Sequence, residues 1–153
     1  MNLGIIGNGF VGSSVAFGFS PQCGCDGANV KIYDKNDSKS LHSMDEVVNT
    51  SDFIFVSVPT PSNKDGSMNL DIVYDVLSQM NEINNRTNNI FLLRSTVTPG
   101  TTRKLQRKFK NLNLVFNPEF LTERSAKFDF INQSRFILGG RKKDVKKVSE
   151  MYR

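Results

Sequence analysis

A glycine-rich segment directly after a short apolar run most constrains the fold of this chain. Residues 7–12 read G-N-G-F-V-G, follow the apolar residues 3–6 and precede a stretch with helical spacing. This pattern is typical of dinucleotide binding, because the turn is tight, the backbone approaches a pyrophosphate, and the helix packs closely on the strand. Free N–H groups at the helix start would bind the phosphates. The predicted cofactor-binding residues here are Gly7, Asn8, Gly9, Phe10, Val11 and Gly12.

An acidic residue follows the second apolar run. Residues 30–33 end at Asp34, about 20 residues after Gly12, the spacing at which a carboxylate meets the adenosine ribose. The alternative is that Asp34 only starts a turn, as Asp often does. The glycines, the run and the spacing together favour the ribose role. Because a 2′-phosphate would meet this carboxylate, we predict NAD rather than NADP.

Length and composition indicate one globular domain. The chain has 153 residues, of which 38% are hydrophobic and 23% charged. No stretch approaches the roughly 20 apolar residues of a membrane span, and the start lacks a basic leader, so we expect a cytoplasmic protein without membrane contact. Cys23 and Cys25 are expected to be free thiols. His42 is expected to be a solvated loop residue, and no metal site is predicted.

The net charge of +5 comes largely from two basic segments, residues 103–110 and 141–147. A nucleic-acid interface would interleave such charges with stacking aromatic residues or carry a recognisable motif, and neither is present. We therefore expect two solvated helix faces and no nucleic-acid binding, with some attraction for an acidic nucleotide substrate.

Strand-like and helix-like segments alternate along the whole chain. This pattern predicts an α/β fold with a doubly wound, mostly parallel six-stranded Rossmann sheet in a single domain. The runs taken as strands are residues 3–6, 30–33, 53–58, 90–93, 114–116 and 136–138, the last closed by Gly139 and Gly140. The segments taken as helices are residues 10–19, a short helix capped by Ser43, one capped by Asn69, one capped by Thr98 with Pro99 in its first turn, and one from Lys143 to the end.

Residues 117 and 118 repeat the cap-plus-proline pattern after the fifth strand. Asn117 would cap a helix, which would place Glu119 in its first turn, where the helix dipole favours a carboxylate. Neither the cap nor a turn explains why Thr96 and Glu119 stand at strand ends, where doubly wound folds bind ligands.

Several motifs occur together in one order: G-N-G-F-V-G, V-P-T-P (58–61), S-T-V-T-P-G-T-T (95–102), N-P-E-F-L-T-E (117–123), F-D-F (128–130) and R-F-I-L-G (135–139). The set resembles the N-terminal NAD-binding domain of the UDP-glucose/GDP-mannose dehydrogenase family, over residues 1–140. The resemblance implies an NAD-dependent enzyme that oxidises the C6 alcohol of a nucleotide sugar to a carboxylate in two hydride transfers.

The resemblance also implies roles for individual residues. Glu119 would be the acid/base group, and Thr96 would lie near the nicotinamide and a catalytic water. Beside the glycines and Asp34, the expected cofactor-binding residues are Pro59, Thr60, Ser95 and Thr96. The residues expected to border the sugar are Glu119, Phe120, Leu121 and Glu123.

The sequence departs from the family pattern in three places. Residues 35–51 form a short connection, so the adenine contacts are not carried over, and Arg124 stands where family members commonly have glycine. The family's nucleophilic cysteine and catalytic lysine lie in a central helix and second domain that this sequence does not contain. Cys23 and Cys25 cannot replace that cysteine, because they precede the second strand.

Residues 1–140 are therefore expected to form the NAD-binding domain, and residues 141–153 a basic helix leading to the missing part. A second polypeptide or a homo-oligomer would complete the site, and the chain alone would be inactive. Two alternatives remain: an NAD domain of the 6-phosphogluconate or hydroxyacid dehydrogenase type, and a non-catalytic nucleotide-binding module. The former shares the glycine motif but does not explain P-E-F-L-T-E.

Overall fold

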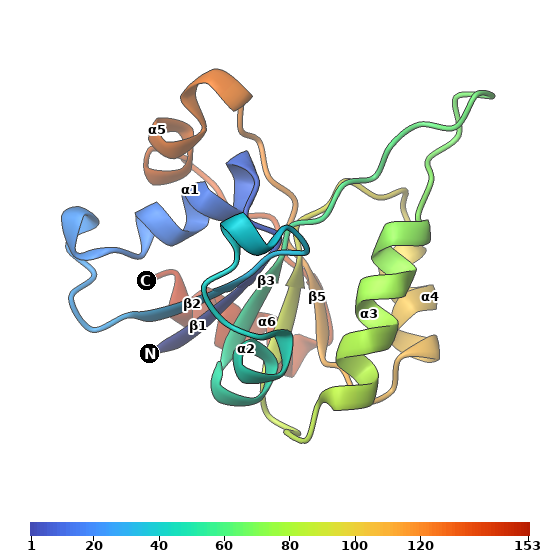
Figure 1. The fold of residues 1–153 in the computed structure, drawn as a ribbon, viewed down its shortest axis with the longest axis horizontal. Helices are drawn as coiled ribbons and strands as arrows, with labels where there is room; N and C mark the ends of the chain where they lie inside the picture. Colours follow the sequence, from blue (N-terminus) through green and yellow to red (C-terminus); the bar gives the residue numbers. More distant parts are fainter.

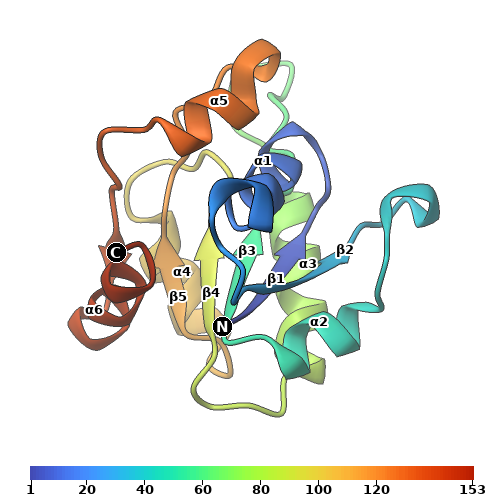
Figure 2. The ribbon, with the colours of Figure 1, turned by 90° about the vertical axis from the view of Figure 1, so that its left-hand side faces the viewer.

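The computed structural model describes all 153 residues as one six-stranded sheet with helices on both faces (Figures 1 and 2). The strand order is β2-β1-β3-β4-β5-β6, with β6 antiparallel and the others parallel. The strands are β1 (Asn2–Ile6), β2 (Asn29–Tyr33), β3 (Phe53–Val56), β4 (Ile90–Leu93), β5 (Leu114–Phe116) and β6 (Gly139–Gly140). The predicted doubly wound, mostly parallel Rossmann sheet is confirmed.

Six α-helices and three short 3-10 turns connect the strands. The α-helices are α1 (Phe10–Gly18), α2 (Met44–Thr50), α3 (Asp71–Ile83), α4 (Thr101–Lys108), α5 (Ala126–Ile131) and α6 (Lys142–Met151). The 3-10 turns are η1 (Pro21–Cys23), η2 (Asp37–Lys39) and η3 (Glu123–Ser125). None of the helices has the length and apolarity that crossing a membrane requires.

The buried strands divide their side chains between two hydrophobic clusters, one on each face of the sheet. Ile54 and Val56 of β3 join the cluster under α2, α3 and α4, whereas Phe55 joins the one under α1, α5 and α6. Successive side chains of a strand point to opposite faces, so a strand covered on both sides is apolar throughout. This explains why β3 and β4 read as continuous apolar runs, and it leaves the strand ends as the place for polar chemistry.

The sixth strand differs from the prediction. Residues 136–138 are not a strand; Gly139 and Gly140 instead pair antiparallel with Phe116 and Val115. Phe136 stacks on Tyr152, with the ring centroids 3.9 Å apart. The apolar run therefore covers the end of α6 instead of extending the sheet.

The helix starts expected at the two proline-containing segments are also wrong. Gly100 has a left-handed backbone (φ +87°), and α4 begins after it at Thr101, while the Thr98 hydroxyl contacts that of Thr101. Residues 117–122 are not helical, so Glu119 lies in an irregular segment. By contrast, the Ser43 hydroxyl accepts the predicted capping hydrogen bond from the Glu46 N–H.

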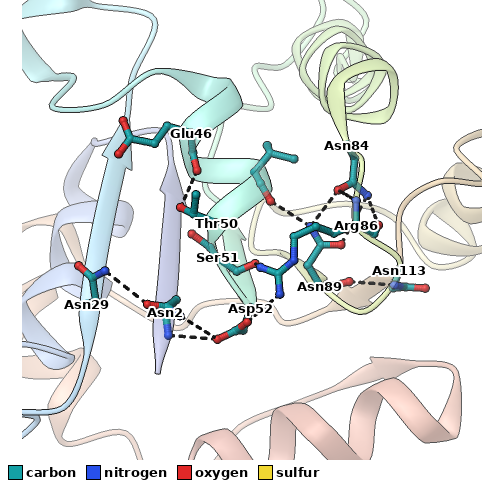
Figure 3. Close-up of polar contacts among 11 residues, drawn as sticks. Asn2, Asn29, Glu46, Thr50, Ser51, Asp52, Asn84, Arg86, Asn89 and Asn113 are labelled. Carbon is teal, nitrogen blue, oxygen red and sulfur yellow. Dashed lines mark hydrogen bonds and ion pairs between the residues drawn. The ribbon is translucent and has the colours of Figure 1, made fainter.

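At the amino ends of the strands, side-chain amides join the loops (Figure 3). Asn89 is fully buried, and its Nδ2 donates to the Val48 carbonyl oxygen and to Asn84 Oδ1, both at 3.0 Å. Nearby, Arg86 Nη2 donates to Asp52 Oδ1 at 3.0 Å. These contacts fix the end of the sheet opposite the carboxyl ends of the parallel strands.

Candidate functional site

A cleft with a volume of about 1030 Å³ lies at the carboxyl ends of β1, β3 and β4. Ligands of doubly wound folds bind at this edge, outside the carboxyl ends of the strands. Of the predicted site residues, those that line the cleft are Gly7, Gly9, Phe10, Val11, Asp34, Pro59, Thr60, Ser95, Thr96 and Glu119. The fold thus brings together residues from five separate segments of the chain.

The three glycines of the loop meet three different steric demands. Gly7 has φ +94°, and a Cβ there would lie 2.4 Å from the Ser57 carbonyl oxygen. A Cβ at Gly12 would lie 1.9 Å from the Gly7 carbonyl oxygen, so this glycine lets α1 start against the loop. A Cβ at Gly9 would meet nothing within 4 Å, because Gly9 faces open space. Of the three glycines, only Gly9 therefore leaves room for a ligand to approach the protein backbone closely.

Asp34 both supports the glycine loop and lines the cleft. Its Oδ2 accepts a hydrogen bond from the Asn8 N–H at 2.6 Å, and its Oδ1 accepts one from the Asn36 N–H at 2.8 Å. Asn8 Nδ2 also donates to the Lys39 carbonyl oxygen at 2.9 Å. Asp34 does start a turn, as the alternative interpretation has it. Its position in the cleft also leaves the ribose role available.

A further wall of the cleft, which the sequence did not predict, comes from β2, the loop after it, α2 and α3. The added lining residues there are Tyr33, Lys35, Asn36, Lys39, Met44, Ile72, Asp75, Val76 and Gln79. The short 35–51 connection still reaches the cleft through Met44. Val76 had the helical spacing of a core position, and periodicity alone does not separate a core position from a cleft wall.

Two serines line the middle of the cleft. Ser95 Oγ donates to the Val58 carbonyl oxygen at 2.5 Å and so joins the segments after β3 and β4. Ser57 Oγ is buried and has no hydrogen-bond partner. Because a buried hydroxyl without a partner is costly, Ser57 is a group that a bound ligand could satisfy.

Thr60 directly precedes residues 61–68, which form the projecting arm in Figure 1. A bridge between Ser62 and Met68 closes this arm.

Glu119 is a carboxyl group that lines the cleft, and it is half-buried. Burial raises the pKa of this carboxyl above its usual value, and the nearby Arg94 guanidinium opposes the rise. A carboxyl with a raised pKa exchanges protons closer to neutral pH, as general acid/base catalysis requires. Glu119 lines the cleft from the non-helical segment 117–122.

Three of the residues expected to border the sugar do not line this cleft. Phe120 is 53% exposed, with the Arg135 guanidinium 5.7 Å from its ring centroid, and Leu121 packs on the cluster under α1, α5 and α6. Glu123 and Arg124 line a separate hollow of about 360 Å³ between the start of α1 and η3.

The histidine and the cysteines lie away from the cleft. His42 Nδ1 accepts a hydrogen bond from the Ile32 N–H at 3.1 Å and is half-buried. His42 therefore lies in a loop, as expected, but its imidazole is only partly exposed and extends the hydrogen bonding of β2. Cys23 and Cys25 are free thiols, and the Cys25 thiol donates to the Gly18 carbonyl oxygen at 3.6 Å.

Residues 37–153 match the family described as "UDP-glucose/GDP-mannose dehydrogenase family, NAD binding domain". The chain belongs to this family. It is 30% identical over 177 residues to a UDP-glucose 6-dehydrogenase of Haloferax volcanii, covering 91% of the chain and 41% of that protein. It is 33% identical over 101 residues to a UDP-glucose 6-dehydrogenase of Campylobacter jejuni, covering 64% of the chain and 25% of that protein.

Solved structures with the same fold include two dehydrogenases. A GDP-mannose dehydrogenase from Pseudomonas aeruginosa aligns with a TM-score of 0.81 at 23% identity, covering 99% of this chain and 43% of that one. A UDP-glucose dehydrogenase from Pyrobaculum islandicum aligns with a TM-score of 0.79 at 24% identity, covering 97% and 42%. The chain thus spans less than half the length of these relatives.

NAD, the cofactor of this domain family, fits the cleft on three observations. Gly9 leaves open space beside the start of α1, Asp34 lines the wall next to it, and Ser57 Oγ lacks a partner deeper in the cleft. The cleft volume is also at the upper end of the roughly 300–1,000 Å³ usual for ligand sites.

Proposed function

We propose that this chain is the NAD-binding part of a cytoplasmic nucleotide-sugar 6-dehydrogenase that oxidises the C6 alcohol of a UDP-glucose-like substrate to a carboxylate. The observation that carries the proposal is the composition of the cleft. One hollow is lined by the glycine loop, Asp34, Thr96 and the half-buried carboxyl of Glu119.

The proposed reaction removes four electrons from the substrate. The substrate loses two hydrides, gains one oxygen atom from water and releases protons. NAD, when bound, supplies the hydride acceptor. Glu119 would take a proton from the attacking water, since its half-buried carboxyl is suited to proton exchange, and the exposed Thr96 would orient that water.

We propose further that the 153 residues bind NAD but do not complete this reaction. Holding the intermediate as a thioester needs an activated thiolate, which divides one difficult conversion into accessible steps. Neither Cys23 nor Cys25 lines the cleft. A second polypeptide would therefore supply the thiolate, and it or another copy of this chain would help to hold the nucleotide sugar within near-attack distance.

The test is NADH formation from NAD and UDP-glucose, measured by absorbance with the chain alone and with the C-terminal half of a related dehydrogenase added. We expect no turnover by the chain alone and NADH formation after the addition. Glu119→Gln should abolish the restored turnover while NAD binding, measured by calorimetry, stays within about twofold, since the amide preserves size and removes the acid/base group.

Two results would contradict the proposal. One is turnover by the chain alone that survives replacement of both cysteines by serine. The other is restored turnover that persists in Glu119→Gln. If NAD binds tightly but no related C-terminal half ever restores turnover, the non-catalytic nucleotide-binding module becomes the better interpretation.

A further inference from the structure

Arg94 is the most unusual buried side chain in the molecule. It follows β4 directly, it is 0% exposed, and only one of its three nitrogens has a partner. Arg94 Nη1 donates to Asn117 Oδ1 at 2.9 Å, whereas Nε and Nη2 are buried without any hydrogen bond. A buried guanidinium is costly unless its donors are satisfied, so this arrangement calls for an acceptor.

The two unpartnered nitrogens are not a random pair. Nε and Nη2 lie on one edge of the planar guanidinium, and such an edge can bind a carboxylate through two parallel hydrogen bonds. The remaining nitrogen, Nη1, is held by Asn117. The free edge of Arg94 is therefore shaped for a carboxylate.

Three elements supply the groups around this guanidinium. Asn117, directly after β5, accepts hydrogen bonds on Oδ1 from both Arg94 Nη1 and the Tyr152 hydroxyl, the latter at 2.7 Å. The Phe130 ring of α5 lies 5.6 Å from the guanidinium carbon. Burial lowers the pKa of Arg94, and the charges that oppose this are those of Tyr152 and Glu119. Burial also raises the pKa of Tyr152 to about 12, so its hydroxyl is neutral and Glu119 is the carboxylate within reach of Arg94's charge.

We propose that Arg94 is a positioning residue for Glu119: its Nε and Nη2 edge receives the Glu119 carboxylate, while Asn117 and Tyr152 hold the guanidinium from the other side. Arg94 and Asn117 follow adjacent parallel strands, and Glu119 is two residues beyond Asn117. The guanidinium and the carboxyl therefore leave the sheet at the same edge.

Nε and Nη2 have no partner in this structure, so docking requires the Glu119 side chain to turn toward them. Once docked, the carboxylate has one fixed orientation and stays ionised to lower pH than burial alone would permit. Protonation of Glu119 removes the negative charge that holds it to Arg94. The role of this pairing in catalysis rests on the proposed function. The existence of the pairing does not depend on that function.

The first test observes Arg94 directly by ¹⁵N NMR of arginine side chains in the 153-residue chain, without cofactor or substrate. During a pH titration, the Arg94 Nε signal should shift with the same midpoint as the ¹³C carboxyl signal of Glu119. In Glu119→Gln this shift should disappear. In the control Asp129→Asn it should remain, because the Asp129 carboxylate is bonded to Thr122 and Ser125 instead.

The second test observes Glu119 when Arg94 changes. Replacing the cation by a neutral chain in Arg94→Met should raise the Glu119 midpoint by about one pH unit or more, since a charge within about 4–6 Å shifts a carboxyl by 1–3 units. Arg94→Lys, which keeps the charge, should restore most of the difference. A structural role in packing alone would not produce this rescue.

The proposal is overturned if the Arg94 Nε signal does not shift with the Glu119 midpoint. It is overturned equally if the same shift persists in Glu119→Gln. It is also overturned if a folded Arg94→Met chain keeps the parent midpoint. If Arg94→Met does not fold, the first test still decides, because Glu119 lies in a non-helical segment and its amide variant leaves Arg94 in place. Since neither test measures turnover, a failure here is distinct from a failure of the proposed function.

Discussion

Replacing Asp34 separates two tasks that this carboxylate performs. In the free chain it accepts hydrogen bonds from the Asn8 and Asn36 N–H groups at 2.6 and 2.8 Å, and it lines the cleft beside the glycine loop. A ribose hydroxyl bound to it would add one hydrogen bond to a charged acceptor, worth about 1.5–3 kcal/mol. Asp34→Ala should therefore weaken NAD binding by about 10- to 150-fold.

Asp34→Asn provides the matched control. The amide keeps one acceptor oxygen for a backbone N–H but loses the charge, so the loop should stay ordered while NAD affinity falls less than in the alanine variant. NADP should bind the parent at least about tenfold more weakly than NAD, because its 2′-phosphate approaches a carboxylate of the same sign. In Asp34→Asn this difference should shrink.

Isothermal titration calorimetry with both cofactors measures these effects, and amide NMR spectra report whether residues 7–12 keep their conformation. Equal affinity of the parent for NAD and NADP would refute the reasoning. So would an Asp34→Ala chain that binds NAD as tightly as the parent.

Three further predictions follow from contacts described above. Gly12→Ala should lower the free energy of unfolding by about 1–3 kcal/mol in a denaturant titration, because its Cβ would lie 1.9 Å from a backbone oxygen, whereas Gly9→Ala should keep stability and lose NAD affinity. Burial alone would raise the pKa of Asp52, but hydrogen bonds from Arg86 and Asn2 and the Arg86 charge outweigh it and lower the pKa. The ionised carboxylate therefore contributes to the free energy of unfolding above its ordinary pKa of 3.8, and this contribution is lost as the pH falls through the lower pKa of the folded chain. Acid unfolding followed by circular dichroism should consequently be less steep in Arg86→Met than in the exposed control Arg103→Met; identical curves would contradict this. Finally, a gel shift should find no sequence-specific nucleic-acid complex at physiological salt, since phosphate contacts from the basic helices alone weaken steeply with salt.

The glycine loop and Asp34 could be predicted from the sequence because their requirements are local. The tight turn and the close approach both require glycine within residues 7–12, and the acid follows at a fixed spacing of about 20 residues. The same holds for the buried strands β3 and β4, whose continuous apolar runs follow from helices on both faces.

The position of Glu119 could not be predicted from its neighbours. Asn117 followed by proline has the pattern of a helix start, but the Asn117 amide is occupied by Arg94 and Tyr152, which lie 23 and 35 residues away. Arg94 itself left one signal that sequence reasoning missed: a charged residue directly after a strand that is buried on both faces. Contacts between distant segments also decide the conformation of residues 136–138, which do not pair in the sheet and of which Phe136 stacks on Tyr152.

The amide network at the amino ends of the strands has a chemical consequence for the ageing of the protein. Asn89 Nδ2 donates to two acceptors, the Val48 carbonyl oxygen and Asn84 Oδ1, in a fully buried position. Hydrolysis of that amide to a carboxylate would replace a double donor with a group that only accepts, and it would place a charge opposite two oxygen atoms. Loss of one ammonia molecule would thus break the contacts between loops at the amino ends of the strands, while every residue of the cleft remained unchanged.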